Sequence, residues 1–270
     1  MKIAAVLIVY NGQPYIGKWL QHYTSCPWID YVCVAEGATV NMMRALDLTS
    51  TRSTDGTMEA IAEYTAHPKV LWTFSNKPYT EKNEQSNAAM SVVPDDTDYI
   101  WISAADEFYH HEDIRQMRGL LESGGYTFVE LFMYHFWKSG NTIGTGGNGY
   151  AYDQPIERIF KYHTGARFTD HRPIRLNDAA GRSVKEINPL TANRHPVRCY
   201  HYSYVDEKMV REKMRYYTVT MKRDYMPWFQ YCWQAWTPQN RAEIEAKWSI
   251  HPSCPGAVTR DVFVDHPIEL

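Results

Sequence analysis

Apolar runs and helix-like segments alternate through the first half of the chain, and this alternation limits the fold more strongly than any other sequence feature. Residues 3–9 form a continuous apolar, β-branched run, as a strand buried on both faces requires. This order predicts an α/β fold with an open, mostly parallel, Rossmann-like sheet and helices on both faces. Further strands are expected at 31–34, 70–74 and 99–102, and helices after Pro14, from residues 53–57 onward, over 81–92 and around 112–122.

The pattern changes after about residue 125. A helix is predicted from Asp206, an N-cap residue that precedes an apolar stripe. The glycine-rich stretch 140–149 lacks the spacing of a phosphate-binding loop, so we interpret it as a mobile loop. Strands rich in aromatic and β-branched residues are expected at 126–137, 156–162, 166–176 and 197–204.

No internal repeat or low-complexity linker divides the chain. We therefore expect one continuous domain over residues 1–222, built from two halves over 1–125 and 126–222. Residues 223–270 are rich in Trp, Tyr and Pro, and we predict a helical C-terminal extension that packs on the same domain.

Charge and cysteine content exclude several classes of function. The chain has 28 basic and 31 acidic residues, so it has no basic surplus that would favour nucleic-acid binding. Five cysteines without a C-x-x-C pair argue against a disulfide framework or a cysteine zinc site, and favour a cytoplasmic location. No run of about 18 apolar residues is present, so no membrane span is expected, and the apolar N-terminus is interpreted as a strand, not a signal peptide.

Polar residues follow each strand predicted in the first half. Ligands of open parallel sheets bind at the carboxyl ends of the strands, so these residues are candidates for a site. Their mixture suits a sugar nucleotide with its metal ion, because carboxylates bind ribose hydroxyls and the metal, amides reach the base, and lysine offsets phosphate charge. The residues are Tyr10, Asn11, Glu36, Gly37, Asn76, Lys77, Lys82, Asn83, Glu84, Asn87, Asp106 and Glu107.

Five motifs in order make the chain resemble a known family. They lie within residues 8–16, 34–38, 53–57, 81–87 and 101–108, and weaker matches follow at 157–161 and 200–204. With these motifs the sequence resembles the glycosyltransferases of the GT-A fold, in particular the family 2 glycosyltransferases. The resemblance covers residues 1–115 well. It implies that residues 1–125 bind a nucleotide sugar and that 126–222 form the acceptor side.

The activity implied by the resemblance is transfer of a sugar from a nucleoside-diphosphate sugar, with UDP favoured, to an acceptor hydroxyl. The implied reaction is metal-dependent and inverting. The acceptor is a glycan or a protein side chain, and the aromatic residues that concentrate after residue 125 favour a glycan. The family's aspartate motif binds Mn²⁺ or Mg²⁺, which stabilises the departing diphosphate. Ala104 stands where the first aspartate of that motif is usual, which leaves Asp106 as metal ligand. Because related enzymes often add a histidine from a late strand, His201 is the second candidate ligand, with a core histidine as the alternative.

An inverting transferase needs a general base on the acceptor side. Asp170 is our candidate, with His171 as substitute or partner, although the pair also suits a surface turn. Glu130 is a second candidate, because it places a charge inside an apolar strand. Positive charge for the diphosphate is offered by Arg172, Lys208 and Arg211, although residues of this kind more commonly form solvated helix faces.

On the donor side, the resemblance assigns eight residues to the sugar nucleotide. Asp55 is equally well explained as a helix cap, and Lys82 with Asn87 as an exposed helix face. The eight are Tyr10, Asn11, Glu36, Asp55, Lys82, Asn87, Ala104 and Ala105.

Two alternative functions stay open. Ala104 also suits a catalytically impaired relative that binds sugar nucleotides without transferring the sugar. A nucleotidyltransferase shares the open sheet and acidic metal site, but residues 11–14 lack the glycine-rich loop common after its first strand.

Aromatic residues make up 14% of the chain. Trp19, Trp72 and Trp101 fall on predicted helices and strands and are explained as core. The aromatics of residues 225–236 suit either a core or an acceptor site, because sugar rings pack on aromatic faces.

Overall fold

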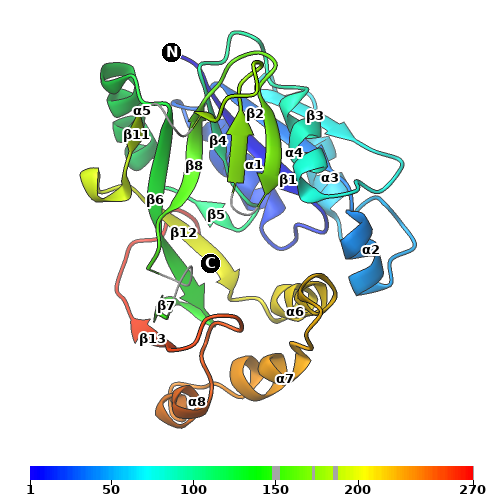
Figure 1. Cartoon of the computed structure of the whole chain (residues 1–270), viewed down its shortest axis with the longest axis vertical. Coiled ribbons are helices and arrows are strands. Elements are labelled where there is room, and N and C mark those ends of the chain that lie inside the picture. Colours follow the sequence, from blue (N-terminus) through cyan, green and yellow to red (C-terminus); the bar gives the residue numbers. More distant parts are fainter. Residues whose placement is uncertain (148–152, 172–173, 185–187, 270) are drawn as a thin grey trace.

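The computed structural model describes residues 1–147, 153–171, 174–184 and 188–269. Within them, eleven strands form one sheet, and its main path runs β13-β7-β6-β8-β4-β1-β2-β3 (Figure 1). The predicted α/β fold with an open, mostly parallel sheet and helices on both faces is confirmed.

The centre of the sheet is parallel. β1 (Ile3–Val9) pairs with β2 (Tyr31–Glu36) and β4 (Tyr99–Ile102), and β2 pairs with β3 (Val70–Phe74). All four strands were expected from their apolar runs, which are needed because helices cover both faces. β8 (Ile156–Lys161) then runs antiparallel to both β4 and β6 (Phe128–Trp137), so the second half of the chain extends the same sheet.

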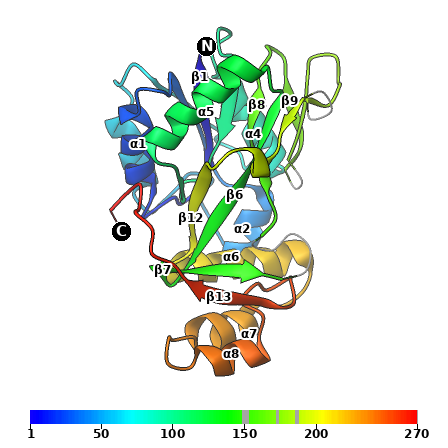
Figure 2. The ribbon, with the colours of Figure 1, turned by 90° about the vertical axis from the view of Figure 1, so that its left-hand side faces the viewer.

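Two separate cores lie on the two faces of this sheet. On one face, Trp19 of α1 and Met117 of α5 pack with Leu7. On the other face, Ala89 and Met90 of α4 pack with neighbouring strand residues. Figure 2 shows α1 and α5 on the side of the sheet away from α4. The helices of this region are α1 (Ile16–Ser25), α2 (Val40–Leu46), α3 (Thr57–Glu63), α4 (Lys82–Met90) and α5 (His111–Gly124).

The glycine-rich stretch is not the loop that we expected. Residues Ser139–Gly146 form β7, which pairs antiparallel with β6 on one side and β13 (Ala257–Asp261) on the other. Backbone hydrogen bonds on both edges hold this strand, so it needs little support from side chains. Residues 148–149 of the stretch lie outside the described residues.

Short strands complete the second half. The strand expected over 166–176 is a hairpin of β9 (Arg167–His171) and β10 (Ile174–Asn177). β12 (Arg198–Tyr204) pairs parallel with β6 and antiparallel with β5 (Glu107–Phe108). The remaining pieces are β11 (Pro189–Leu190) and a 3₁₀ helix over Ala192–Arg194.

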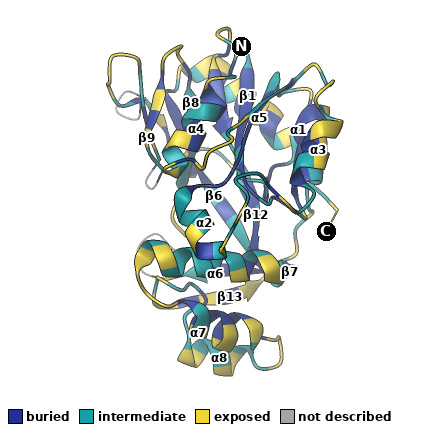
Figure 3. Ribbon diagram, turned by 90° about the vertical axis from the view of Figure 1, so that its right-hand side faces the viewer, coloured by how far each residue is buried: buried dark blue, intermediate teal, exposed yellow. Residues whose placement is uncertain are grey.

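After β12 the chain forms a group of helices over residues 207–247. In α6 (Glu207–Met221), the Asp206 side chain accepts a hydrogen bond from the Met209 backbone N–H at 2.8 Å, which confirms the predicted cap. A short α7 (Met226–Trp228), a π-helix over Phe229–Gln234 and α8 (Arg241–Lys247) follow, and Figure 3 shows α7 and α8 beyond β13.

Most aromatics of residues 225–236 are core, so their interpretation as an acceptor surface is wrong. Trp228, Trp233 and Trp236 are all buried with Trp137 in one apolar cluster. Their indole N–H groups donate to partners inside the protein, including the Ser249 and Tyr204 carbonyls at 2.8 and 3.0 Å. Tyr231 is the exposed member.

No helix among the described residues is long and apolar enough to cross a membrane.

Candidate functional site

Asp106 and His201 meet at the carboxyl end of the parallel strands. Asp106 lies in the turn after β4, and the β5–β12 pairing places His201 opposite the next residue, Glu107. The Tyr202 N–H donates to the Asp106 carbonyl at 2.9 Å. As a result, the His201 Nε2 atom lies 3.4 Å from the Asp106 Oδ2 atom. The two residues predicted as metal ligands are therefore neighbours.

A buried network fixes the turn that carries Asp106. The Ser103 hydroxyl accepts from the Trp19 indole at 3.1 Å and lies 3.0 Å from the Tyr23 hydroxyl. Glu107, 1% exposed, accepts from the Ala104 N–H at 3.1 Å and is held by Arg158. Ala104 and Ala105 are thus part of a turn whose backbone conformation is fixed by the buried hydrogen bonds of Ser103 and Glu107.

His135 of β6 lies next to His201 on the neighbouring strand. β6 and β12 are parallel, with His135 and His201 paired in register, and the two Nδ1 atoms are 2.9 Å apart. Burial, together with the charges of His201 and Lys213, holds the pKa of His135 well below its ordinary value, so this ring is neutral. Burial alone raises the pKa of Asp106, but the charge and hydrogen bond of His201 outweigh it and hold that pKa below its usual range.

Lys213 of α6 brings a positive charge to this region, and the sequence reasoning missed it. Its Nζ atom donates to the hydroxyl of Ser203 and, at 3.3 Å, to the Ser203 carbonyl. Its charge also lowers the pKa of Asp106. The sequence could have indicated this residue, because Lys213 directly precedes Met214 of the buried stripe of α6. Lys208 and Arg211, two of the basic residues considered from the sequence, are instead exposed and pair with Glu212 and Glu207, and Arg172 lies outside the described residues.

On the donor side, the loop after β1 is tied to the loop before α3. The Asn11 backbone, with φ at 48°, donates to Ser53 Oγ at 2.8 Å, and Asn11 Oδ1 accepts from the Thr54 N–H at 2.9 Å. Asp55 Oδ2 accepts from the Gln13 N–H at 3.0 Å, while its Oδ1 accepts from Thr57. Asp55 therefore binds the first residue of α3 from the position before the N-cap residue, Gly56, and is not itself the N-cap.

Glu36 is fully buried and bound within the protein. Its carboxylate accepts from Arg52 Nε at 2.7 Å and from the Ser53 N–H at 2.6 Å. The Arg52 guanidinium lies over the Phe74 ring, 3.7 Å from its centroid. Tyr10 is buried beside them and donates to the Ser50 carbonyl at 3.4 Å. At this edge Phe74 is exposed and Arg52 is half-buried, whereas Glu36 is fully buried.

Lys82 and Asn87 both lie on α4, Lys82 at its first residue and Asn87 in its second half. Lys82 begins the helix, with its Nζ atom 5.0 Å from the centre of the Tyr216 ring of α6. Asn87 binds the β9 backbone, because its Oδ1 accepts from the Phe168 N–H at 2.8 Å and its Nδ2 donates to the Phe168 carbonyl at 2.9 Å. Asn87 thus fastens the hairpin that carries Asp170.

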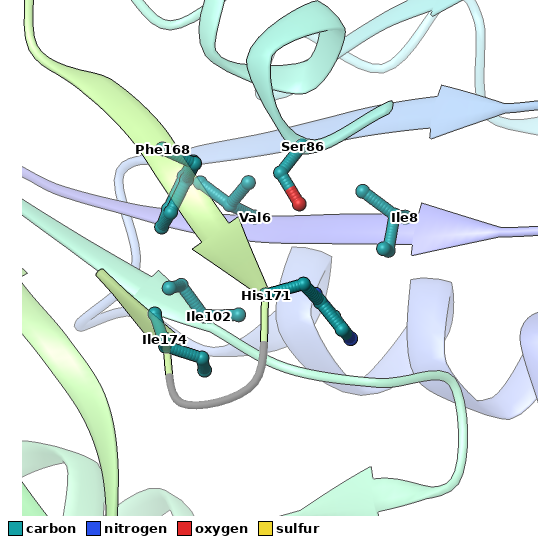
Figure 4. Close-up of a pocket in the computed structure, with 7 residues that line it drawn as sticks. All are labelled: Val6, Ile8, Ser86, Ile102, Phe168, His171 and Ile174. Atoms are coloured by element: carbon teal, nitrogen blue, oxygen red, sulfur yellow. The ribbon is translucent and has the colours of Figure 1, made fainter. Parts of the chain in front are cut away.

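Asp170 and His171 are the last two residues of β9, and His171 lies near Ile8 and Ile102 at the carboxyl ends of β1 and β4. Asp170 Oδ1 accepts from the His171 N–H at 2.8 Å. His171 lines a small cavity of about 30 Å³, and Figure 4 shows its ring beside Ile8. The cavity walls are mainly apolar and come from β1, β4, α4, β9 and β10. The other predicted base, Glu130, lies on β6 five residues before His135, roughly 16 Å away along the strand.

No protein-family model and no curated protein sequence matches the chain. Among solved structures, it is similar to Staphylococcus aureus TarS 1–349, with 10% identity, a TM-score of 0.49, and 91% of this chain and 78% of that one covered. TarS 1–349 was also solved with UDP and with UDP-GlcNAc.

Two further structures show weaker likeness. One is a glucosyl-3-phosphoglycerate synthase from Mycobacterium tuberculosis, solved with Mn²⁺ and UDP-glucose, with 18% identity, a TM-score of 0.35, and 49% and 43% of the two chains covered. The other is 4-diphosphocytidyl-2C-methyl-D-erythritol synthase from Anaerococcus prevotii, with 10% identity, a TM-score of 0.35, and 59% and 70% covered.

Proposed function

We propose that the chain is a glycosyltransferase that moves a sugar from a nucleoside-diphosphate sugar, UDP favoured, to an acceptor hydroxyl. The observation that carries the proposal is the meeting of Asp106 with His201 at the carboxyl ends of the parallel strands, where open α/β sheets bind nucleotides. Residues 1–125 supply the donor side of this site and 126–222 the acceptor side. Inversion at the sugar carbon is a part of the proposal that rests on the sequence motifs. A glycan acceptor loses the support of the buried aromatics of residues 225–236 and stays an expectation from the sequence.

The Asp106–His201 pair fits Mn²⁺ or Mg²⁺. Two ligands that each lie about 2.1 Å from an octahedral cation are roughly 3 Å apart, which is close to the 3.4 Å between these two atoms. Within the described residues no group of three His, Cys, Asp or Glu side chains surrounds such a position. A cation held here would take its remaining ligands from donor phosphates and water, and would supply charge to stabilise the diphosphate leaving group.

The chain's own residues have distinct parts in this proposal. Lys213 adds positive charge beside Asp106 and would offset the charge that develops on the diphosphate. Asp170 would accept the proton of the acceptor hydroxyl, with His171 as its partner. The Arg52–Phe74 stack offers a flat surface and guanidinium donors next to the strand ends, which suits a nucleobase.

A thermal-shift screen of sugar nucleotides with and without Mn²⁺ tests the proposal first. A donor that binds the folded state raises the melting temperature by mass action. We expect a UDP-sugar to give the largest shift, and Mn²⁺ to increase it. If no sugar nucleotide shifts the melting temperature, the donor site is wrong.

The second candidate is an impaired relative, and Ala104 is the observation that favours it. Donor hydrolysis or transfer by the purified protein with Mn²⁺ separates the two functions. Binding without turnover would favour the impaired relative, and a large gain in Ala104→Asp would then show that the site is disabled only there. Consumption of a nucleoside triphosphate with release of pyrophosphate would instead indicate a nucleotidyltransferase.

A further inference from the structure

The strand that carries His201 changes its hydrogen bonding at this residue. Up to His201, β12 pairs with β6 in regular parallel register, but the register shifts between His201 and Tyr204. On the other edge of β12, which pairs with β5, the Tyr202 N–H donates to the Asp106 carbonyl at 2.9 Å. Irregularities of this kind commonly re-aim a side chain next to an active site. The backbone therefore brings His201 next to Asp106, but the orientation of its ring depends on the side chains that it contacts.

His135 contacts the His201 ring at the nitrogen atom that does not face Asp106. Its Nδ1 atom lies 2.9 Å from the Nδ1 atom of His201, and the ring centroids are 4.9 Å apart at an interplanar angle of 65°. The opposite ring atom of His201, Nε2, is then the one that faces Asp106. If Nε2 is to bind a cation, the imidazole proton must sit on Nδ1 and be donated to the Nδ1 atom of His135, which requires His135 to carry its own proton on Nε2.

We propose that His135 is a positioning residue that holds the His201 imidazole with Nε2 directed at Asp106, and so sets the affinity of this pair for a divalent cation. The inference rests on the proposed function, in which Asp106 and His201 are the metal ligands. The ring contact is not needed to join the strands, because backbone pairs such as Cys199 with Met133 and Tyr200 with Tyr134 already connect β12 to β6. Hydrogen-bond partners of metal-binding histidines typically change metal affinity by 10–100-fold when they are removed.

The test compares three substitutions by their Mn²⁺ dissociation constant, measured by electron paramagnetic resonance on the full chain with UDP present. His135→Asn keeps a polar atom near the Nδ1 position, His135→Gln moves it to the Nε2 position, and His135→Phe keeps a planar ring without it. We expect Gln and Phe to weaken Mn²⁺ binding by about 10–100-fold. We expect Asn to stay within a few-fold of the unsubstituted protein, a rescue that a merely space-filling role would not give.

A second comparison places each removal in a His201→Ala background. If His135 acts through His201, His135→Phe has no further effect on the Mn²⁺ dissociation constant there, because the group that it positions is gone. Melting temperatures and circular dichroism confirm that each variant is folded. If either removal fails to fold, the other carries the test together with the Asn variant.

Two outcomes would overturn the inference by itself: tight Mn²⁺ binding in both the Gln and Phe variants, or an equal loss with and without His201. A different result marks failure of the proposed metal site. If the unsubstituted protein with UDP binds no Mn²⁺, there is no cation site to position, and the inference is overturned together with the metal dependence of the proposed function.

Discussion

Glu107 and Arg158 form a two-pronged ion pair inside the protein, although they lie 51 residues apart in the chain. Arg158 Nη2 and Nε donate to the two carboxylate oxygens at 2.6 and 2.9 Å, and the side chains are 15% and 2% exposed for Arg158 and Glu107. Glu107 also accepts from the Ala104 N–H. This pair joins β8 to the turn that carries Asp106, so it couples the stability of the fold to the shape of the site.

Removal of the arginine should destabilise the protein strongly. Arg158→Met leaves the Glu107 carboxylate buried without its partner, which typically costs about 3–5 kcal/mol of the free energy of unfolding. The measurement is urea unfolding followed by circular dichroism. Arg115→Met is the matched control, because Arg115 makes a similar two-pronged pair with Glu112 on the exposed face of α5. We expect no measurable change there, and equal losses in the two variants would contradict this account.

Asp106→Asn should remove metal dependence without unfolding the chain. The amide keeps the shape of the carboxylate but not its charge, so a cation loses a ligand and its main charge partner. We expect Mn²⁺ affinity and sugar transfer to fall at least about 100-fold, since the contribution of such a metal is several kcal/mol. Asp261→Asn is the control, because Asp261 of β13 pairs with Arg241 of α8 at the surface, and this variant should keep both properties. Full Mn²⁺-dependent transfer by Asp106→Asn would exclude Asp106 as a ligand.

Asp170→Asn should slow the chemical step and leave donor binding unchanged. A general base typically contributes about 10²–10⁴-fold, so kcat should fall by that factor while the dissociation constant of the donor stays the same. Initial rates and donor titration by calorimetry give the two quantities. Glu130→Gln tests the alternative base in the same assay. If Glu130→Gln lowers kcat and Asp170→Asn does not, the base is Glu130.

His22 should make the protein less stable in mild acid. Burial, aided by the nearby His111, lowers the pKa of His22 to about 3. The unfolded chain takes up this proton near pH 6.5, whereas the folded chain does not, so stability falls as the pH drops below 6.5. Between pH 7 and pH 5 this single group should remove about 2 kcal/mol from the free energy of unfolding.

The check on His22 is urea unfolding at both pH values. His22→Phe keeps a ring of similar size beside Tyr23 and Phe108, and should lose less stability over this interval than the unsubstituted protein. Equal losses in the two proteins would show that other groups cause the pH dependence.

The parts of the fold that depend on local pattern could be predicted from the sequence. β1 to β4 are visible because strands covered by helices on both faces must be apolar throughout, and Asp206 is visible because a helix needs a cap at its start. β7 was not visible, since its glycines carry no apolar pattern and its support comes from β6 and β13 on its two edges. The burial of Trp228 and Trp233 was likewise decided by what packs against them.

The candidate site divides in the same way. The sequence by itself determined that Asp106 and His201 are candidates, because each stands in a motif. Only the tertiary structure decided that they lie 3.4 Å apart. It also decided that His135, 66 residues before His201 in the chain, contacts the His201 ring, and that Arg158 binds Glu107 in the turn that carries Asp106. The physical reason is that strand pairing brings together residues from distant parts of the chain. No local pattern records which side chains such pairing makes neighbours.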